Sequence, residues 1–236
     1  MRIGLVSFLQ KKGNVSYNLA KVEKAMKLMS GKDDLLVFGE AFLQGFDALS
    51  FDYEKDLEMA LSTDSSVFQQ ICHYSGQYEI DVLIPFYEKE DGNIYSSAAL
   101  IQEGDIRLVY RRMSKGWKDI KKCDKHYKEG KKPARFKYKG HPFTLALCGD
   151  LWECEKKYDR EEFLLWMLYV NFSLEEWKNS EKEAYALQAG KCSDRALIVN
   201  SLSHKPDSAG GAFYAEFGRI RKSMPFDQEG ILTVEI

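Results

Sequence analysis

The sequence predicts an α/β protein built on a mixed β-sheet, and three observations lead to this class. Apolar runs at 2–8 and 35–38 flank a segment with helical periodicity, which is typical of parallel strands joined by a right-handed crossover. Alternating segments between Asp81 and Met113 are separated by short turns, which favours antiparallel strands. Later apolar runs end abruptly in polar residues, as buried strands do where they leave a sheet.

Residues 2–38 form the first crossover unit. Its helix is predicted from apolar residues at helical spacing, namely Leu19, Val22, Met26 and Met29. Asn14 or Ser16 can cap the start of this helix, and Gly31 ends it. The strand at 35–38 then delivers Glu40 to its carboxyl end.

A second helix is expected after a loop. Residues 41–58 are rich in aromatic and acidic side chains, and we expect a loop there that lines the strand ends. Asp64 or Ser65 can cap the following helix, which runs to about Tyr78.

Turn residues organise the middle of the chain. Asp91-Gly92 and Glu103-Gly104-Asp105 join antiparallel strands, and Lys139-Gly140 forms the turn of a hairpin over 136–147. The chain order therefore changes from crossover units to a meander, so the sheet is mixed.

The last third of the chain predicts one further helix over 180–193. Buried strands are expected at 196–200, 210–214 and 230–234. The apolar stretch Phe163 to Phe172 fits either the tail of a helix or a buried strand, because periodicity does not separate the two.

Composition narrows the function classes. Hydrophobic residues make up 44% and charged residues 30%, and the net charge of -2 gives no electrostatic case for binding nucleic acid or an anionic membrane. No apolar run is long enough to span a bilayer, and the N-terminus reads as a strand and not as a signal peptide. Without repeats or linkers, a single domain over 1–236 is the simplest expectation.

Cysteine and histidine usage points to a reduced compartment. Five cysteines without a disulfide-type spacing favour a cytoplasmic protein, and four scattered histidines form no metal signature. We therefore expect neither a metal nor a cofactor. The stretch 113–132 carries eight lysines and is expected to be a solvated face, although one lysine can still turn inward.

Two strand ends carry the residues best suited to chemistry. Cys148 ends an apolar run that begins at Phe143, and a cysteine at the rim of a sheet can act as a nucleophile on a small substrate. Gly149 leaves its N–H unshielded, so this group can stabilise an oxyanion. Glu40 stands at the carboxyl end of another strand, where α/β proteins place their catalytic groups. The alternative is that Cys148 is a small buried apolar residue and that Glu40 merely reaches solvent.

These segments together resemble the nitrilase superfamily, also called the carbon–nitrogen hydrolases. The matches are residues 36–47, which contain Gly39-Glu40, residues 145–152, which contain Cys148-Gly149-Asp150, and the hairpin 95–111, with support from 196–200 and Gly210-Gly211. Each motif is short, but their order and spacing extend over nearly the whole chain.

The resemblance implies a four-layer α-β-β-α sandwich with two mixed β-sheets and a Glu-Lys-Cys catalytic set. It implies hydrolysis of a small-molecule amide, nitrile or N-carbamoyl group through a cysteine thioester, with Glu40 as base, Cys148 as nucleophile and Gly149 as oxyanion donor. It also implies a homodimer, for which the apolar stretch Phe163 to Phe172 gives weak independent support.

Three features depart from the family pattern, namely the residue before Glu40, the lysine and a second acidic residue. Gly39 replaces a common proline, and Arg112 stands where the lysine normally follows Tyr-Arg. We expect Lys115 to supply the catalytic ammonium, with Lys118 as the alternative, because arginine is not an equal substitute for a compact ammonium.

The second acidic residue of the family has no clear match, and Asp124 and Glu129 are the candidates. Two other functions stay open. One is a catalytically impaired binding or assembly module, which the Arg112 departure favours. The other is a thiol redox protein, which is disfavoured because no resolving cysteine neighbours Cys148 except Cys154, which is expected on another element. The sequence does not specify the substrate.

Overall fold

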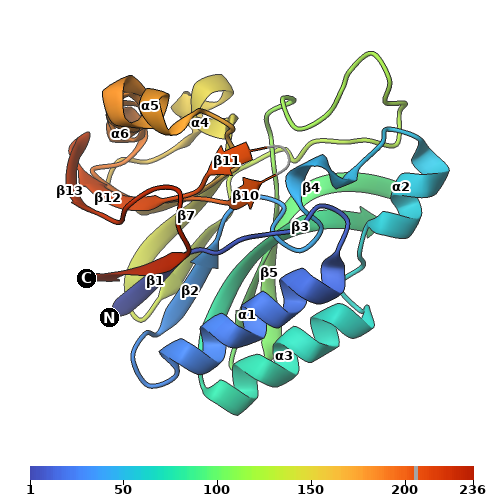
Figure 1. Ribbon diagram of the computed structural model, residues 1–236, viewed down its shortest axis with the longest axis horizontal. Helices are drawn as coiled ribbons and strands as arrows, with labels where there is room; N and C mark the ends of the chain where they lie inside the picture. Colours follow the sequence, from blue (N-terminus) through green and yellow to red (C-terminus); the bar gives the residue numbers. More distant parts are fainter. Residues whose placement is uncertain (205–206) are drawn as a thin grey trace.

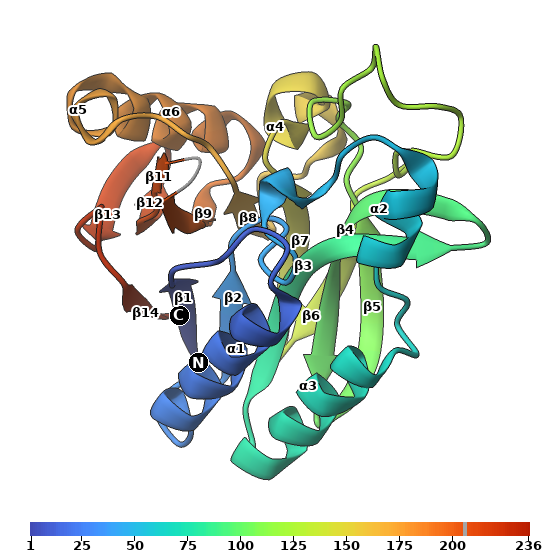
Figure 2. The ribbon, with the colours of Figure 1, turned by 45° about the vertical axis from the view of Figure 1, so that its right-hand side comes forward.

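The computed structural model describes residues 1–204 and 207–236. In this part of the chain, two large β-sheets pack face to face and helices cover their outer faces (Figures 1 and 2). The structure confirms the four-layer α-β-β-α sandwich with two mixed sheets. The termini lie close together, since the Met1 ammonium donates to the Ile236 carbonyl across 3.0 Å.

The first sheet has the strand order β14-β1-β2-β3-β4-β5. Parallel pairs join β1, β2 and β3, and antiparallel pairs add the others. Its strands are β1 Arg2–Ser7, β2 Leu35–Phe38, β3 Asp81–Glu90, β4 Asn93–Gln102, β5 Asp105–Arg111 and β14 Gly230–Glu235.

The second sheet has the order β13-β12-β9-β8-β7-β6, with β7, β8 and β9 parallel at its centre. Its strands are β6 Arg135–Tyr138, β7 His141–Leu147, β8 Phe163–Leu168, β9 Arg195–Asn200, β12 Ala212–Glu216 and β13 Arg219–Ser223. A short hairpin, β10 Leu202–His204 with β11 Asp207–Ala209, stands apart from both sheets.

The helices form the outer layers. On one side α1 Val15–Met29 and α3 Ser66–Tyr78 lie side by side, with α2 Tyr53–Met59 near the strand ends (Figure 2). The other side carries α4 Asp150–Glu153, α5 Leu174–Glu176 and α6 Lys182–Cys192, with a π-helical turn between α5 and α6. Asn14 caps α1 as one of the two predicted caps, since its side chain accepts from the Tyr17 N–H.

Apolar burial explains the layering. One core cluster lies between the sheets, where Leu5 and Val37 of the first sheet meet Leu145 and Leu165 of the second. Separate clusters fill the space between the first sheet and α1 and α3, and between the second sheet and α6. Strands buried on both faces therefore appear as continuous apolar runs in the sequence.

Two expectations need correction. Residues 41–58 are not only a loop, because α2 begins at Tyr53 and Asp56 anchors it by accepting from the Ser50 and Phe51 N–H groups. The stretch Phe163 to Phe172 begins as β8, which is fully buried at the centre of the second sheet. Its apolar character is thus explained within one chain and gives no support to a dimer interface.

Candidate active site

Glu40 follows β2 directly and is fully buried between the two sheets. Its N–H donates to the Leu168 carbonyl across 3.0 Å, and the Ser201 hydroxyl donates to its carbonyl across 3.2 Å. Gly39 permits this close approach, because a Cβ there would lie 2.3 Å from the Ser201 Oγ. A proline in place of Gly39 would meet the same obstruction.

The Glu40 carboxylate is held through one of its oxygens. Oε1 accepts from the Ser96 hydroxyl at 2.9 Å and from the Arg112 Nη1 at 2.8 Å. Oε2 is buried and receives no hydrogen bond from any described residue. One oxygen is therefore fixed, and the other keeps its lone pairs for another donor.

Arg112 is the cation at this site. It comes directly after β5, is 2% exposed, and uses its Nε to donate to the Ser114 hydroxyl across 2.7 Å. A Cβ built on Gly149 would lie 2.8 Å from the Arg112 Nη2. The guanidinium thus spans from the Glu40 carboxylate to the turn that follows Cys148.

Cys148 sits in a sharp turn at the end of β7, with a positive φ of 36° that few non-glycine residues adopt. The backbone is fixed there because its N–H donates to the Met167 carbonyl at 2.9 Å and its carbonyl accepts from the Trp166 indole at 2.8 Å. Its Sγ lies 3.5 Å from the Tyr169 carbonyl. The thiol is therefore presented at a defined position on the sheet edge.

Asp150 joins the Cys148 turn to the Arg112 segment. This buried carboxylate accepts from the N–H groups of Met113, Ser114 and Leu147 at 2.8–2.9 Å, and from the Tyr110 hydroxyl. Removing it would leave three buried N–H groups without this acceptor. Asp150 positions the two segments that carry the cation and the thiol.

Burial and charge set the ionisation of these groups. Burial raises the pKa of Glu40 above its usual value, although the Arg112 guanidinium opposes this shift. Burial, together with the negative charge of Glu40, raises the pKa of the Cys148 thiol to about 12, again against the effect of Arg112. Burial lowers the pKa of Arg112, but Glu40 and the other nearby acidic groups raise it by more. The resting thiol is therefore protonated at neutral pH and needs a base to become a nucleophile.

The lysines of the basic stretch lie elsewhere. Lys115 is exposed and its backbone N–H donates to Glu153, so the structure does not bring Lys115 to Glu40 or Cys148. Lys118 donates to the Tyr127 carbonyl and pairs with Glu129. The chain turns Arg112 inward immediately after β5 and carries Lys115 to the surface, so the ion-pair partner of Glu40 in the structure is an arginine.

The two candidates for a second acidic residue are also outside the cluster. Asp124 is exposed and pairs with His126, whereas Glu129 pairs with Lys118. The buried acidic neighbour of the site is Asp150, which stands in the Cys148-Gly149-Asp150 motif.

Sequence reasoning missed the inward position of Arg112, although a signal was present. The residues of β5 alternate, and Arg112 continues the alternation of Leu108 and Tyr110 toward the interior. In contrast, Ser96 and Ser114 have no distinctive pattern, and only their hydrogen bonds reveal them.

Within the described residues, no group of three or more histidine, cysteine and acidic side chains is arranged to hold a metal ion. Among the helices of the same residues, none is both long and apolar enough to cross a membrane. The cluster consists of a thiol, a carboxylate, a guanidinium and backbone N–H groups, which suits nucleophilic acyl transfer.

Comparison with known proteins identifies related sequences. The profile of the carbon-nitrogen hydrolase family matches residues 2–170. A glutamine-dependent NAD(+) synthetase of Aquifex aeolicus is 25% identical over 146 residues, which are 59% of this chain and 24% of that protein. An (R)-stereoselective amidase of Pseudomonas is 30% identical over 112 residues, which are 48% of this chain and 39% of that protein. The chain thus spans about a quarter to two fifths of the curated relatives it matches.

Solved structures share the fold at low identity. A CN-hydrolase superfamily protein from Xanthomonas campestris, with an arsenic adduct in its active site, superposes with a TM-score of 0.80 at 15% identity, covering 99% of this chain and 89% of that one. An amidase from Nesterenkonia sp. AN1 superposes with a TM-score of 0.79 at 14% identity, covering 100% and 92%. At these identities, the likeness establishes the fold alone.

Proposed function

The chain belongs to the carbon–nitrogen hydrolase family, and on this premise we propose that it cleaves an amide or N-carbamoyl C–N bond of a small molecule through a thioester on Cys148. In this proposal Glu40 is the general base and acid, and Gly149 donates its N–H to the oxyanion. Arg112, in place of Lys115, is the cation that stabilises both. We also propose that residues 1–236 act as one domain.

The single observation that carries the proposal is the unequal hydrogen bonding of the two Glu40 carboxylate oxygens. Ser96 and Arg112 both bind Oε1, which leaves Oε2 buried and without a described donor. A merely structural carboxylate is expected to be satisfied at both oxygens. An oxygen kept free in a buried site is suited to accept a proton during a reaction.

Acylation follows from this arrangement. Glu40 Oε2 takes the Cys148 proton as the sulfur attacks the carbonyl carbon of the substrate. The tetrahedral oxyanion forms beside the Gly149 N–H and the Arg112 Nη2, whose positive charge stabilises it. Glu40 then returns the proton to the leaving nitrogen, the C–N bond breaks, and ammonia or an amine departs from the thioester.

Deacylation uses the same groups in reverse. Glu40 takes a proton from water, the hydroxide attacks the thioester carbon, and the second oxyanion forms at the same donors. Collapse breaks the C–S bond and the proton returns to the sulfur. Because the pKa of the thiol is raised to about 12, transfer to Glu40 must accompany the attack, since a free thiolate is scarce at neutral pH.

The decisive experiment is an ammonia-release screen with the wild-type protein and Cys148→Ala. The relatives suggest the first substrates, which are glutamine and simple primary amides, followed by N-carbamoyl compounds. Ammonia release by the wild type, absent from a folded Cys148→Ala protein, together with an acyl adduct on Cys148 by intact-mass spectrometry, supports the proposal. Equal release by the two proteins refutes the thioester.

One observation favours a second candidate, a catalytically impaired binding or assembly module. The Arg112–Glu40 ion pair is buried at both partners, and arginine cannot replace the smaller ammonium group without a change of geometry. If no substrate class gives turnover and no acyl adduct accumulates, this candidate takes precedence.

A further inference from the structure

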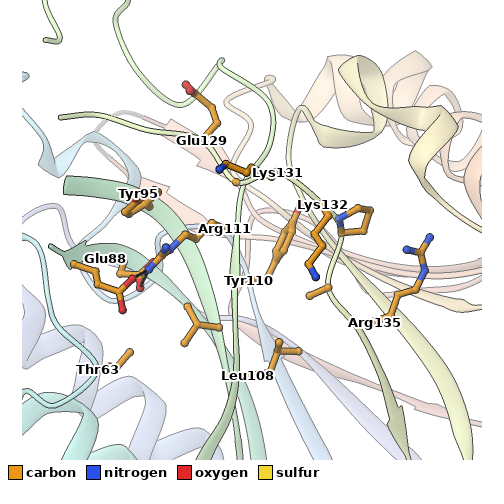
Figure 3. Close-up of a pocket in the computed structure, with 15 residues that line it drawn as sticks. Thr63, Glu88, Tyr95, Leu108, Tyr110, Arg111, Glu129, Lys131, Lys132 and Arg135 are labelled. Atoms are coloured by element: carbon orange, nitrogen blue, oxygen red, sulfur yellow. Dashed lines mark hydrogen bonds and ion pairs between the residues drawn. The ribbon is translucent and has the colours of Figure 1, made fainter. Parts of the chain in front are cut away.

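A cavity of about 860 Å³ lies outside the Glu40–Arg112–Cys148 cluster, on the side where β5 and β6 form the edges of the two sheets (Figure 3). One wall comes from β3, β4 and β5, including Tyr95 and Tyr110, and the other from the segment 129–135. Its volume lies within the range of small-molecule sites.

The carboxylates that line this cavity already have cationic partners. Glu88 and Glu90 both pair with Arg111, whose guanidinium also stacks on the Tyr95 ring. Glu129 pairs with Lys118. Each lining carboxylate therefore has a cationic neighbour, although Glu88 and Glu90 share Arg111.

The cationic side chains of the segment 129–135 differ in whether they have an acidic partner. Arg135 pairs with Glu162, but Lys131 and Lys132 make no ion pair with any described residue. Figure 3 shows that both lysines come from the same segment as Glu129, and that the Arg111 side chain turns toward Glu88. The lining therefore carries four cationic and three anionic side chains, an excess of one positive charge, and its two cations without an ion pair lie on the same segment.

The backbone that carries these lysines is fixed. The Gly130 N–H donates to the Arg112 carbonyl across 2.7 Å, and the Lys131 carbonyl accepts from the Lys157 ammonium across 2.9 Å. A Cβ on Gly130 would lie 2.1 Å from the Arg111 carbonyl oxygen, so the segment packs tightly against the end of β5. A fixed backbone lowers the entropic cost of placing two ammonium groups around a ligand.

We propose that this cavity binds a small molecule with a dianionic group, of the phosphate monoester class, through Lys131 and Lys132. The two ammonium groups on these consecutive residues have no ion-pair partner among the described residues and together match the charge of a phosphate monoester at neutral pH, and lysine is a common phosphate ligand. The half-buried apolar side chains of Leu108 and Val109 provide a surface for the organic part. This site is separate from the catalytic cluster, since Arg111 reaches Glu88 whereas Arg112 reaches Glu40.

The experiment is calorimetric titration of the full chain with phenyl phosphate at pH 7.5, with benzoate as a probe that keeps the ring and carries one charge. The test variant is Lys131→Ala/Lys132→Ala. The matched control is Lys121→Ala/Lys125→Ala, which removes the same charge from two exposed lysines of the same basic stretch that do not line the cavity. Circular dichroism verifies the fold of each variant.

We expect saturable binding of one phenyl phosphate per chain and weaker binding of benzoate. The test variant should bind phenyl phosphate at least ~10-fold more weakly, and the control should stay within about twofold of the wild type. No saturable binding, equal affinity for benzoate, or equal losses in both double variants would overturn the proposal. None of these outcomes depends on turnover, so they are independent of the amidase proposal.

Discussion

Removal of the Arg112 side chain is the sharpest test of how the site is held. Arg112→Ala deletes the buried cation and leaves Glu40 without its ionic partner. The exposed fractions of the two residues are 2% and 0%, so solvent does not replace the lost interaction. A loss of stability is expected even though no apolar core residue changes.

The magnitude follows from the geometry. At 2.8 Å and an effective dielectric of about 20, the attraction between Arg112 and Glu40 is about 6 kcal/mol. The cost of burying both charges offsets much of this, but removing a single partner from a buried pair costs about 3–5 kcal/mol, because the remaining charge stays buried. The exposed Arg160–Asp194 pair provides the control, and Arg160→Ala should cost at most about 1 kcal/mol.

The loss should also depend on pH. Burial raises the pKa of Glu40 in the folded state. The protonated form of Glu40 therefore contributes to the free energy of unfolding at low pH, and this contribution is lost as pH rises through the folded-state pKa. Without Arg112, the pKa of Glu40 rises further. The stability gap between wild type and Arg112→Ala should therefore be small at acidic pH, where Glu40 is protonated in both proteins, and should widen toward pH 8.

The assay is urea unfolding followed by circular dichroism at several pH values between 5 and 8, with Arg160→Ala beside Arg112→Ala. A gap that does not change with pH would contradict the assignment of the loss to Glu40. An Arg112→Ala loss no larger than that of Arg160→Ala at pH 8 would show that the buried pair contributes little.

Four further predictions concern the reaction and the assembly. Glu40→Gln should slow hydrolysis by ~10²-fold or more because it removes the base. The double variant Glu40→Gln/Cys148→Ala should be no less active than Cys148→Ala, and steady-state rates with a substrate from the screen test both expectations. Lys115→Ala should leave kcat within about twofold of wild type, since this exposed side chain is not brought to the cluster, and a dead variant would restore Lys115 to the mechanism. Gly149→Ala should abolish turnover in a folded protein, because the new Cβ would lie 2.8 Å from the Arg112 Nη2 and 3.0 Å from the Ser114 Oγ. Wild-type kinetics of this variant would show that the contact does not matter for turnover. The chain should form a homodimer, and a monomer mass by light scattering at micromolar concentration would refute this.

The order of strands and helices could be predicted because their signals are local. The helical spacing from Leu19 to Met29 and the turns at Asp91-Gly92 and Lys139-Gly140 specify elements that the structure confirms. The sequence of 163–172 does not decide between strand and helix, because a strand buried on both faces has no alternation to distinguish it from a buried helix. Only its pairing with β7 and β9 settles it.

The candidate site was predictable at its strand ends but not in its connecting loop. Glu40 and Cys148 each follow a buried strand, one in each sheet, and the face-to-face packing of the sheets brings the two strand ends together. The identity of the cation is not predictable in this way, because its position depends on which way the chain turns after β5. Counting residues from the strand end favoured Lys115, whereas the side-chain alternation of the strand continues through Arg112.

The replacement of lysine by arginine has a consequence for how this site works. A lysine ammonium is compact, and its charge can be altered by desolvation, whereas a guanidinium stays charged and extends over several donors. Here Nη1 binds Glu40, Nε binds Ser114 and Nη2 approaches the Gly149 turn. One rigid group therefore connects the Glu40 carboxylate to the turn that follows Cys148. Asp150 fixes the Ser114 N–H and the Leu147 N–H, so it holds the segment that positions the guanidinium against the segment that carries the thiol. In the proposed reaction, this planar cation lies beside the carbonyl oxygen of the substrate, where it can stabilise the oxyanion.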